Sequence, residues 1–192
     1  MNLLKYLKNV FLNKRVLNAF FFWYNVDGGS MERIDKINYY LDLAEVTLER
    51  GTCIRRNYGA VIVNNDEIVS TGYVGAPRGR VNCNELGYCI REKMNVPRGE
   101  RYELCRSVHA EQNAIISAER RKMINSTLFL CGKKYTDGSY ITNSNPCGLC
   151  KRMIINAGIK DIYIRDSKEE YRHIMVQDYI DNDESINGTL GY

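Results

Sequence analysis

The sequence predicts one α/β domain, a sandwich of helices packed on a mixed β-sheet. Two β-rich runs, YGAVIV at 58–63 and IVSTGY at 68–73, flank a polar turn at 64–67, which predicts a β-hairpin. Further along, a strand–helix–strand order across 127–165 predicts two parallel strands joined by a right-handed crossover. The 192 residues are enough for one domain with a substantial core.

The other elements follow from the spacing of apolar residues and from residues that end helices. Apolar residues recur at helical spacing from Ile34 up to Gly51, which predicts the first helix. Residues 75–106 are rich in Gly, Pro, Arg and Cys without a period, so we expect a long irregular segment there. After it we predict a helix over 109–122, a strand over 127–131, a polar loop over 132–146, a helix over 147–157 ended by Gly158, and a strand over 161–165.

Three segments are expected along the chain: an N-terminal extension over 1–30, a domain over 31–180 and a polar tail over 181–192. The extension is basic and apolar, but its apolar run AFFFWY is too short to span a membrane. It also lacks the small-residue cleavage site of a secretory signal. The extension could be a membrane-surface helix, a helix that packs on the domain, or residues translated from an upstream start. We do not expect it to contact a membrane.

Charge and cysteine content narrow the classes of function. The net charge of +4 is mild, and no basic face is clustered in the way of a nucleic-acid-binding protein. The chain has seven cysteines, an odd number, and no secretory signal, which argues against a disulfide framework. We therefore expect a cytoplasmic protein without strong nucleic-acid binding, in which some of the cysteines are metal ligands.

Two short motifs combine into a metal site. In NPCGLC, Cys147 and Cys150 open a predicted helix three residues apart, so both thiols can face one ion. In SVHAEQNAI, His109 opens another predicted helix, and Glu111 follows two residues later. One histidine and two cysteines make three ligands, which is typical of a catalytic zinc that keeps a fourth position open. Glu111 is then placed to carry protons, and the pattern H-x-E with P-C-x-x-C is that of zinc deaminases.

These motifs resemble the cytidine/deoxycytidylate deaminase superfamily. SVHAEQNAI, NPCGLCKRMIINAGI, GTCIRRNYGAVIV and STGYVGAPRG are most similar to the dCMP deaminase branch, which includes late-competence deaminase-like proteins. The resemblance runs from about residue 31 to residue 172 and implies a three-layer α/β/α sandwich with a mixed five-stranded sheet. It implies hydrolytic deamination of dCMP to dUMP plus ammonia, with zinc held by His109, Cys147 and Cys150 and with Glu111 moving protons.

The resemblance also implies a set of substrate contacts. They are an apolar wall formed by Gly59, Ala60 and Val61, and a base pocket near Ala110 and Pro146.

A nucleotide phosphate needs positive charge nearby, and we select Arg78 within GAPRG as its partner. At Val74 the chain departs from the family, which usually has a sugar-binding asparagine there, so the exact substrate stays open.

Four cysteines precede the catalytic motif: Cys53, Cys83, Cys89 and Cys105. Some deoxycytidylate deaminases carry a second, structural zinc, and the resemblance implies that these thiols form a closed tetrahedral site that orders the long irregular segment. The alternatives are unconnected thiols, or a site that water and a histidine complete. Cys131, in a predicted strand, is expected in the core, and His173 is not expected to bind metal.

Two other functions compete with dCMP deamination. One is deamination of a base within nucleic acid, such as tRNA. The other is a catalytically silent zinc-binding accessory protein of DNA uptake, against which the presence of Glu111 argues. The resemblance further implies a small-molecule nucleotide substrate, a homo-oligomer, and a nucleoside triphosphate effector such as dCTP or dTTP.

Overall fold

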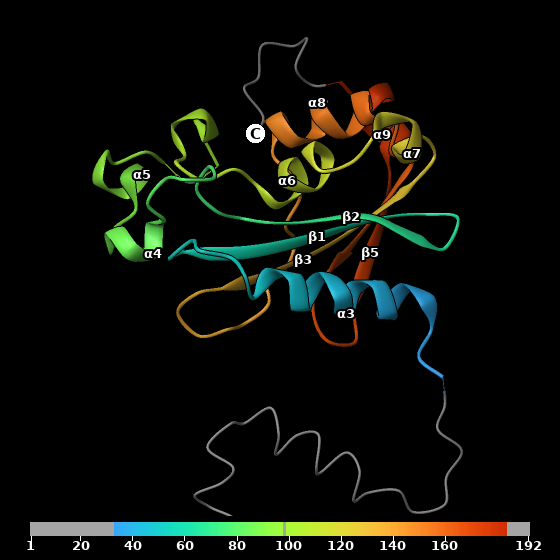
Figure 1. Ribbon diagram of the computed structural model, residues 1–192, viewed down its shortest axis with the longest axis horizontal. Helices are drawn as coiled ribbons and strands as arrows, with labels where there is room; N and C mark the ends of the chain where they lie inside the picture. The colour runs from blue at the N-terminus through green and yellow to red at the C-terminus, as the bar shows by residue number, and fades with distance from the viewer. Residues whose placement is uncertain (1–32, 98, 184–192) are drawn as a thin grey trace, which may run out of the picture. The chain divides into compact units, whose positions relative to one another are not determined.

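The computed structural model describes residues 33–97 and 99–183, and these residues form one five-stranded sheet with helices on both faces (Figure 1). The strand order is β2-β1-β3-β4-β5. The strands are β1 (Arg56–Asn64), β2 (Glu67–Tyr73), β3 (Thr127–Lys134), β4 (Asp161–Arg165) and β5 (Tyr171–Met175). The predictions for residues 1–30 and for 184–192 of the tail lie outside the described residues.

The sheet is mixed, as predicted. β1 and β2 pair as the antiparallel hairpin. β3 and β4, which precede and follow α8 (Gly148–Ala157) in the chain, pair in parallel. β1 joins these two parts because it is antiparallel to β3 as well. β5 pairs antiparallel with β4 and completes the five strands, although no element was predicted at its position from local pattern.

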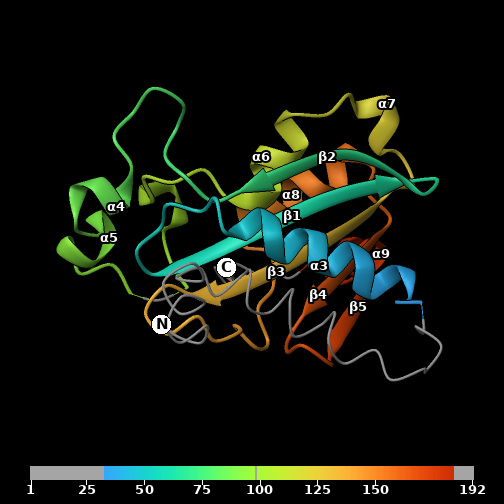
Figure 2. The ribbon, with the colours of Figure 1, turned by 60° about the horizontal axis from the view of Figure 1, so that its bottom comes forward.

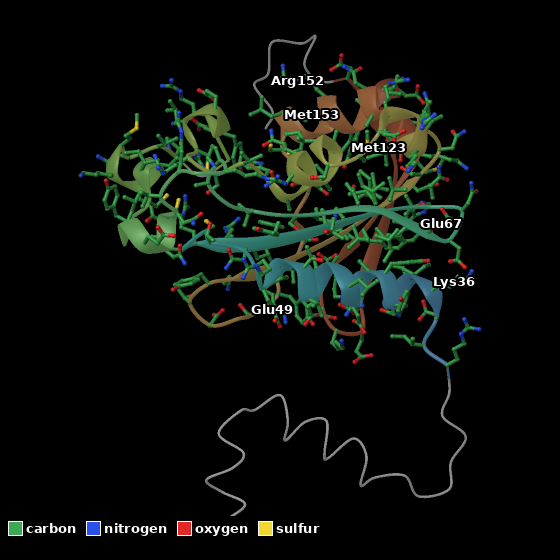
Figure 3. All side chains as sticks on the ribbon, viewed as in Figure 1. Lys36, Glu49, Glu67, Met123, Arg152 and Met153 are labelled. Carbon is green, nitrogen blue, oxygen red and sulfur yellow. The ribbon has the colours of Figure 1, made fainter. Side chains whose placement is uncertain are left out.

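Helices cover both faces of the sheet, which confirms the three-layer α/β/α sandwich (Figure 2). α3 (Lys36–Leu48) packs on one face, where Val61, Phe129 and Cys131 are buried against it. The other face carries the helices α6 (Ala110–Ile116), α7 (Arg120–Met123), α8 and α9 (Val176–Asp181). Figure 3 shows Arg152 on the side of α8 that points away from the sheet, where the side chain is exposed.

Charged groups fix α3 to the sheet. The Arg165 guanidinium is 1% exposed, and its Nη1 donates to Oδ1 of Asp42 at 2.6 Å. Nearby, Nζ of Lys133 donates to Oε1 of Glu45 at 2.5 Å, and the Tyr140 hydroxyl donates to the other carboxylate oxygen. Partners on both sides offset the cost of removing these charges from water.

The helix predicted over 109–122 is wrong in its length. α6 ends at Ile116, and after a break the separate helix α7 begins at Arg120. The break lets Met123 become buried in the core, and it lets Nδ2 of Asn64 donate to the carbonyl oxygens of Lys122 and Ile124. These tertiary contacts override the helical pattern of the sequence.

A close approach of α6 to β2 depends on Gly72. A Cβ atom there would lie 2.2 Å from the carbonyl oxygen of Ala110 and 2.3 Å from the nitrogen of Ala114. Two hydrogen bonds hold the same contact: Ser70 Oγ donates to the Ala114 carbonyl at 2.7 Å, and Asn113 Nδ2 donates to the Tyr73 carbonyl at 2.7 Å. The start of α6 is therefore fixed against the sheet.

The long segment between β2 and α6 is irregular, as predicted, with short helical turns. These are α4 (Cys83–Leu86), α5 (Ile90–Lys93) and the 3₁₀ turn η1 (Tyr102–Leu104). In the described part of the chain, no helix is both long and apolar enough to cross a membrane.

Candidate metal centre and active site

Three side chains meet where two helices begin. His109 is the N-cap residue of α6, Cys147 is the N-cap residue of α8, and Cys150 lies in the first turn of α8. Nδ1 of His109 lies 3.4 Å from the sulfur of each cysteine. Among the described residues, they form the group of three whose potential ligand atoms all lie within 4.8 Å of one another. The structure therefore brings together the three predicted ligands, which are separated by up to 41 residues.

The distances fit a tetrahedral zinc site. With a Zn–S distance of about 2.3 Å and a Zn–N distance of about 2.05 Å, tetrahedral donors lie about 3.6 Å apart. The observed separation of 3.4 Å between Nδ1 and each sulfur is close to that value. Two thiols and one imidazole form a donor set that suits zinc, and a fourth position is left for water.

Protonation within the cluster favours binding of a cation. A hydrogen bond from Cys150 lowers the pKa of Cys147 well below its ordinary value against the effect of burial, which favours the thiolate form. Burial opposes a charge on His109, but hydrogen bonds to Cys105 and Cys147 raise its pKa to about 11. A divalent cation would displace the proton that these groups share.

Glu111 is buried beside the ligands in the first turn of α6 and is 6% exposed. Burial raises the pKa of this carboxyl, against the opposing influence of His109. A carboxyl group whose pKa is raised by burial holds a proton more readily than an exposed one, so it can both accept and donate a proton. This environment suits the predicted role of Glu111 as a proton carrier.

A cavity opens onto the centre. Four of its lining residues belong to the centre or adjoin it: His109, Ala110, Glu111 and Cys147. Its other lining residues include Arg55, Arg56, Tyr58, Val74, Arg91, Tyr102 and Asn145. Most of these residues were not predicted from the sequence, although the basic pair Arg55-Arg56 stands at the start of β1 and is a signal that the sequence offers.

The apolar wall predicted from Gly59, Ala60 and Val61 stays a prediction, and the structure places the three residues as follows. Side chains alternate along β1, so Ala60 is buried on the α6 side, whereas Val61 packs under α3. Gly59 also faces α3, because a Cβ atom there would lie 2.1 Å from the carbonyl oxygen of Ala44. None of the three is among the residues that line the cavity, whereas the neighbouring Tyr58 is.

The other predicted substrate contacts divide between the cavity and the surface. Ala110 lines the cavity, and Pro146 is fully buried between two residues that line it. Arg78 is exposed in a turn and is not among the residues that line the cavity, and its expected contact with phosphate stays a prediction. Val74 is buried at the cavity wall and offers a ligand no hydrogen bond.

The four cysteines proposed for a second zinc do not converge in the described residues to the degree that His109, Cys147 and Cys150 do. Cys53, Cys89 and Cys105 line the cavity, whereas the buried Cys83 lies with its sulfur 3.6 Å from Ser107 Oγ. The second site therefore stays a prediction.

The remaining cysteine and histidine lie away from the centre. Cys131 is a core residue under α3, as predicted. His173 lies on β5, with Nε2 2.7 Å from Oδ1 of Asp161 and its ring stacked on Tyr163.

Comparisons with known proteins agree with this centre. A family model described as the cytidine and deoxycytidylate deaminase zinc-binding region matches residues 34–165. Deoxycytidylate deaminase of Mycobacterium phage D29 is 33% identical over 137 residues, covering 69% of this chain and 95% of the relative. The Schizosaccharomyces pombe deoxycytidylate deaminase is 32% identical over 130 residues, covering 68% of this chain and 37% of the relative, so the chain matches little more than a third of that protein.

A bacterial relative and two solved structures extend the comparison. ComE operon protein 2 of Bacillus subtilis is 31% identical over 135 residues, covering 69% of this chain and 60% of that protein. The cyanophage S-TIM5 dCMP deaminase, solved with dCMP and dUMP, is 25% identical with a TM-score of 0.47 and covers 83% of this chain and 96% of its own. The cytidine deaminase of Burkholderia pseudomallei shares the fold at 16% identity and a TM-score of 0.50, covering 76% of this chain and 95% of its own. The chain belongs to the cytidine and deoxycytidylate deaminase family, and zinc is its cofactor.

Proposed function

We propose that this protein deaminates dCMP to dUMP and releases ammonia. The observation that carries the proposal is the three-ligand centre with the buried Glu111 in the same cavity. Relatives named deoxycytidylate deaminase, from a mycobacteriophage and from fission yeast, support dCMP as the substrate.

The chemistry divides between the cofactor and Glu111. When bound by His109, Cys147 and Cys150, zinc lowers the pKa of a water molecule toward neutrality and so supplies a nucleophile. Glu111 would take a proton from the attacking water and give it to ring nitrogen N3. It would then take the proton of the new hydroxyl group at C4 and give it to the departing amine. One water is consumed and one ammonia leaves, so the amino group at C4 is replaced by a carbonyl oxygen.

The cavity carries positive charge that suits a nucleotide monophosphate. Arg55 pairs with Glu92 at 2.8 Å, but among the described residues no ion pair involves Arg56 or Arg91. Arg91 is 5% exposed, lies over the Tyr102 ring, and donates from Nη2 to the carbonyl oxygens of Pro97 and Glu100, while its Nε has no hydrogen-bond partner in the described structure. Guanidinium groups of this kind favour an anionic substrate over an uncharged nucleoside.

One assay separates this function from its alternatives. Purified protein is incubated with dCMP, CMP, deoxycytidine and a tRNA anticodon stem, and ammonia release is followed. We expect the highest kcat/KM with dCMP. We expect Glu111→Ala to lower kcat by at least about 100-fold, whereas the exposed Glu119→Ala is a control with unchanged activity. Deamination of the tRNA alone would indicate the nucleic-acid alternative.

A catalytically silent accessory protein would give a different result. That alternative is kept because one relative is the B. subtilis ComE operon protein 2. It predicts that wild type and Glu111→Ala are equally inactive on every substrate while zinc is still bound.

The proposal includes features that follow from the resemblance. They are a cytoplasmic location, a homo-oligomer, regulation by dCTP and dTTP, the segment boundaries at 30/31 and 180/181, and the second zinc. Sedimentation with and without each triphosphate tests the assembly and the effectors. Zinc analysis of Cys83→Ser tests the second site, because a content unchanged at one per chain would exclude it.

A further inference from the structure

We infer that Asn145 binds the nucleotide and that Arg172, paired with Asp166, positions it; the inference rests on the proposed function. Asn145 lies two residues before the metal ligand Cys147 and shares the cavity with Glu111. It is exposed there, and of the side chains that line the cavity it alone carries a carboxamide.

Arg172 determines which end of this carboxamide faces a ligand. Nη1 of Arg172 donates to Oδ1 of Asn145 at 3.0 Å. Because a guanidinium only donates hydrogen bonds, it occupies the acceptor end of the amide. Within the described residues Nδ2 of Asn145 makes no hydrogen bond, so its two N–H groups are available. They match acceptor atoms of a nucleotide, such as the ring carbonyl oxygen or the sugar oxygens.

The Arg172–Asp166 pair holds three consecutive residues of the loop before α8. Oδ1 of Asp166 accepts from the backbone N–H of Asn143 at 2.7 Å, and Nη2 of Arg172 donates to the carbonyl oxygen of Ser144 at 2.5 Å. The two side chains bind each other through Nε and Oδ2 of the pair, and again through Nη2 and Oδ1 at 3.2 Å. Side chains from the sheet therefore hold residues 143–145 of the loop in place through hydrogen bonds.

The sheet provides a rigid base for this arrangement. Arg172 lies on β5 opposite Ile164 of β4, and Asp166 is buried directly after the end of β4. The backbone N–H of Asp166 donates to the Glu170 carbonyl at 2.9 Å, which closes the turn between the two strands. Arg172 itself does not line the cavity, so its influence on a ligand must pass through the loop that ends in Asn145.

A double-mutant cycle tests the inference, with Asn145→Ala, Arg172→Gln, Arg172→Lys and the double variant Asn145→Ala/Arg172→Gln. Arg120→Gln is the matched control, because Arg120 is exposed and its Nε also donates to a backbone carbonyl, that of Asn156. For each purified protein we measure zinc per chain, the melting temperature, and KM and kcat for dCMP. Wild-type activity on dCMP is established first, because its absence would refute the proposed function and not this inference.

We expect Asn145→Ala to raise KM by about tenfold with kcat within about twofold, which is the loss of one hydrogen bond to the substrate. Arg172→Gln should raise KM by a similar factor, and the double variant should be no worse than Asn145→Ala alone. Arg172→Lys should recover only part of the loss, since an ammonium lacks the planar fork. Zinc content should be unchanged throughout.

Three outcomes would overturn the inference. An unchanged KM in Asn145→Ala would remove the contact with substrate. If the increase in KM of the double variant equalled the product of the two single increases, Arg172 would act independently of Asn145. The third outcome has two parts: Arg172→Gln loses zinc or folding and Arg172→Lys fully restores it, while Asn145→Ala leaves KM unchanged. It would leave Arg172 and Asp166 a purely structural role.

Discussion

Gly72→Ala should damage the active site, although Gly72 is neither a metal ligand nor one of the residues that line the cavity. A methyl group at this position would lie 2.2 Å from the Ala110 carbonyl oxygen and 2.3 Å from the Ala114 nitrogen, both backbone atoms of α6. Contacts shorter than 3.0 Å are essentially never seen for a Cβ atom, so α6 must move by about 0.8 Å or more. The displaced helix carries His109 and Glu111 with it.

The expected cost follows from two magnitudes. Overpacking of this kind destabilises a fold by about 1–3 kcal/mol, which for a chain of this size lowers the melting temperature by about 3–10 °C. A misplacement of about 1 Å in a catalytic group can cost about 100-fold in rate. We therefore expect Gly72→Ala to lose about tenfold to 100-fold in kcat/KM for dCMP, with reduced zinc content.

Gly75→Ala provides the matched control. Its Cβ would lie 3.2 Å from Thr52 Oγ1, a side-chain atom, and no closer than 3.8 Å to its next neighbour. We expect its melting temperature and kcat/KM to stay close to those of the wild type. If Gly72→Ala behaved like this control, the argument that α6 is fixed by close packing on β2 would be refuted.

Three further changes test the metal centre, the α3 contact and the cavity wall. Cys150→Ser should abolish stoichiometric zinc binding and activity, measured by metal analysis, whereas Cys131→Ala in the opposite core should keep its zinc. Burial opposes the charge of Glu45, but Lys133 and the Tyr140 hydroxyl lower its pKa, so its carboxylate stabilises the fold above the unfolded-state pKa. Glu45→Gln should therefore lower the free energy of unfolding by about 1 kcal/mol or less at pH 7. In acid unfolding scans, this difference from wild type should vanish as pH falls through the lowered pKa. A difference that persisted at pH 2 would contradict this reasoning. Val74→Asn should lower KM for dCMP by about threefold to tenfold while lowering the melting temperature of the free protein, and an unchanged KM would exclude a substrate contact at this wall.

The metal ligands could be predicted from the sequence because zinc requires particular residue types at short spacing. Cys147 and Cys150 share one helical turn, and His109 and Glu111 lie within three residues, so each half of the centre is locally encoded. The hairpin and the parallel pair were predictable for the same reason, since alternation and turn residues act over a few positions.

Contacts that depend on how distant segments pack were not predictable. Both faces of β1 are buried under helices, so residues on both faces are apolar. The sequence pattern therefore cannot predict whether Ala60 or Val61 faces the metal centre. Arg78 and Arg91 both lie between β2 and α6, and no local pattern shows that only Arg91 is buried in the cavity. The early end of α6 is set by burial of Met123, which is again a tertiary effect.

Topology explains why ligands 38 residues apart meet at one point. β2 and β3 are both antiparallel to β1, so they run in the same direction, and β4 is parallel to β3. α6 follows β2 and α8 follows β3, so both helices begin at the same edge of the sheet, where those strands end. The N-terminus of α8 also favours the anionic thiolate of Cys147. Lengthening the loop before α8 should therefore be tolerated, provided that the segment held by Arg172 and Asp166 still delivers Cys147 to this edge.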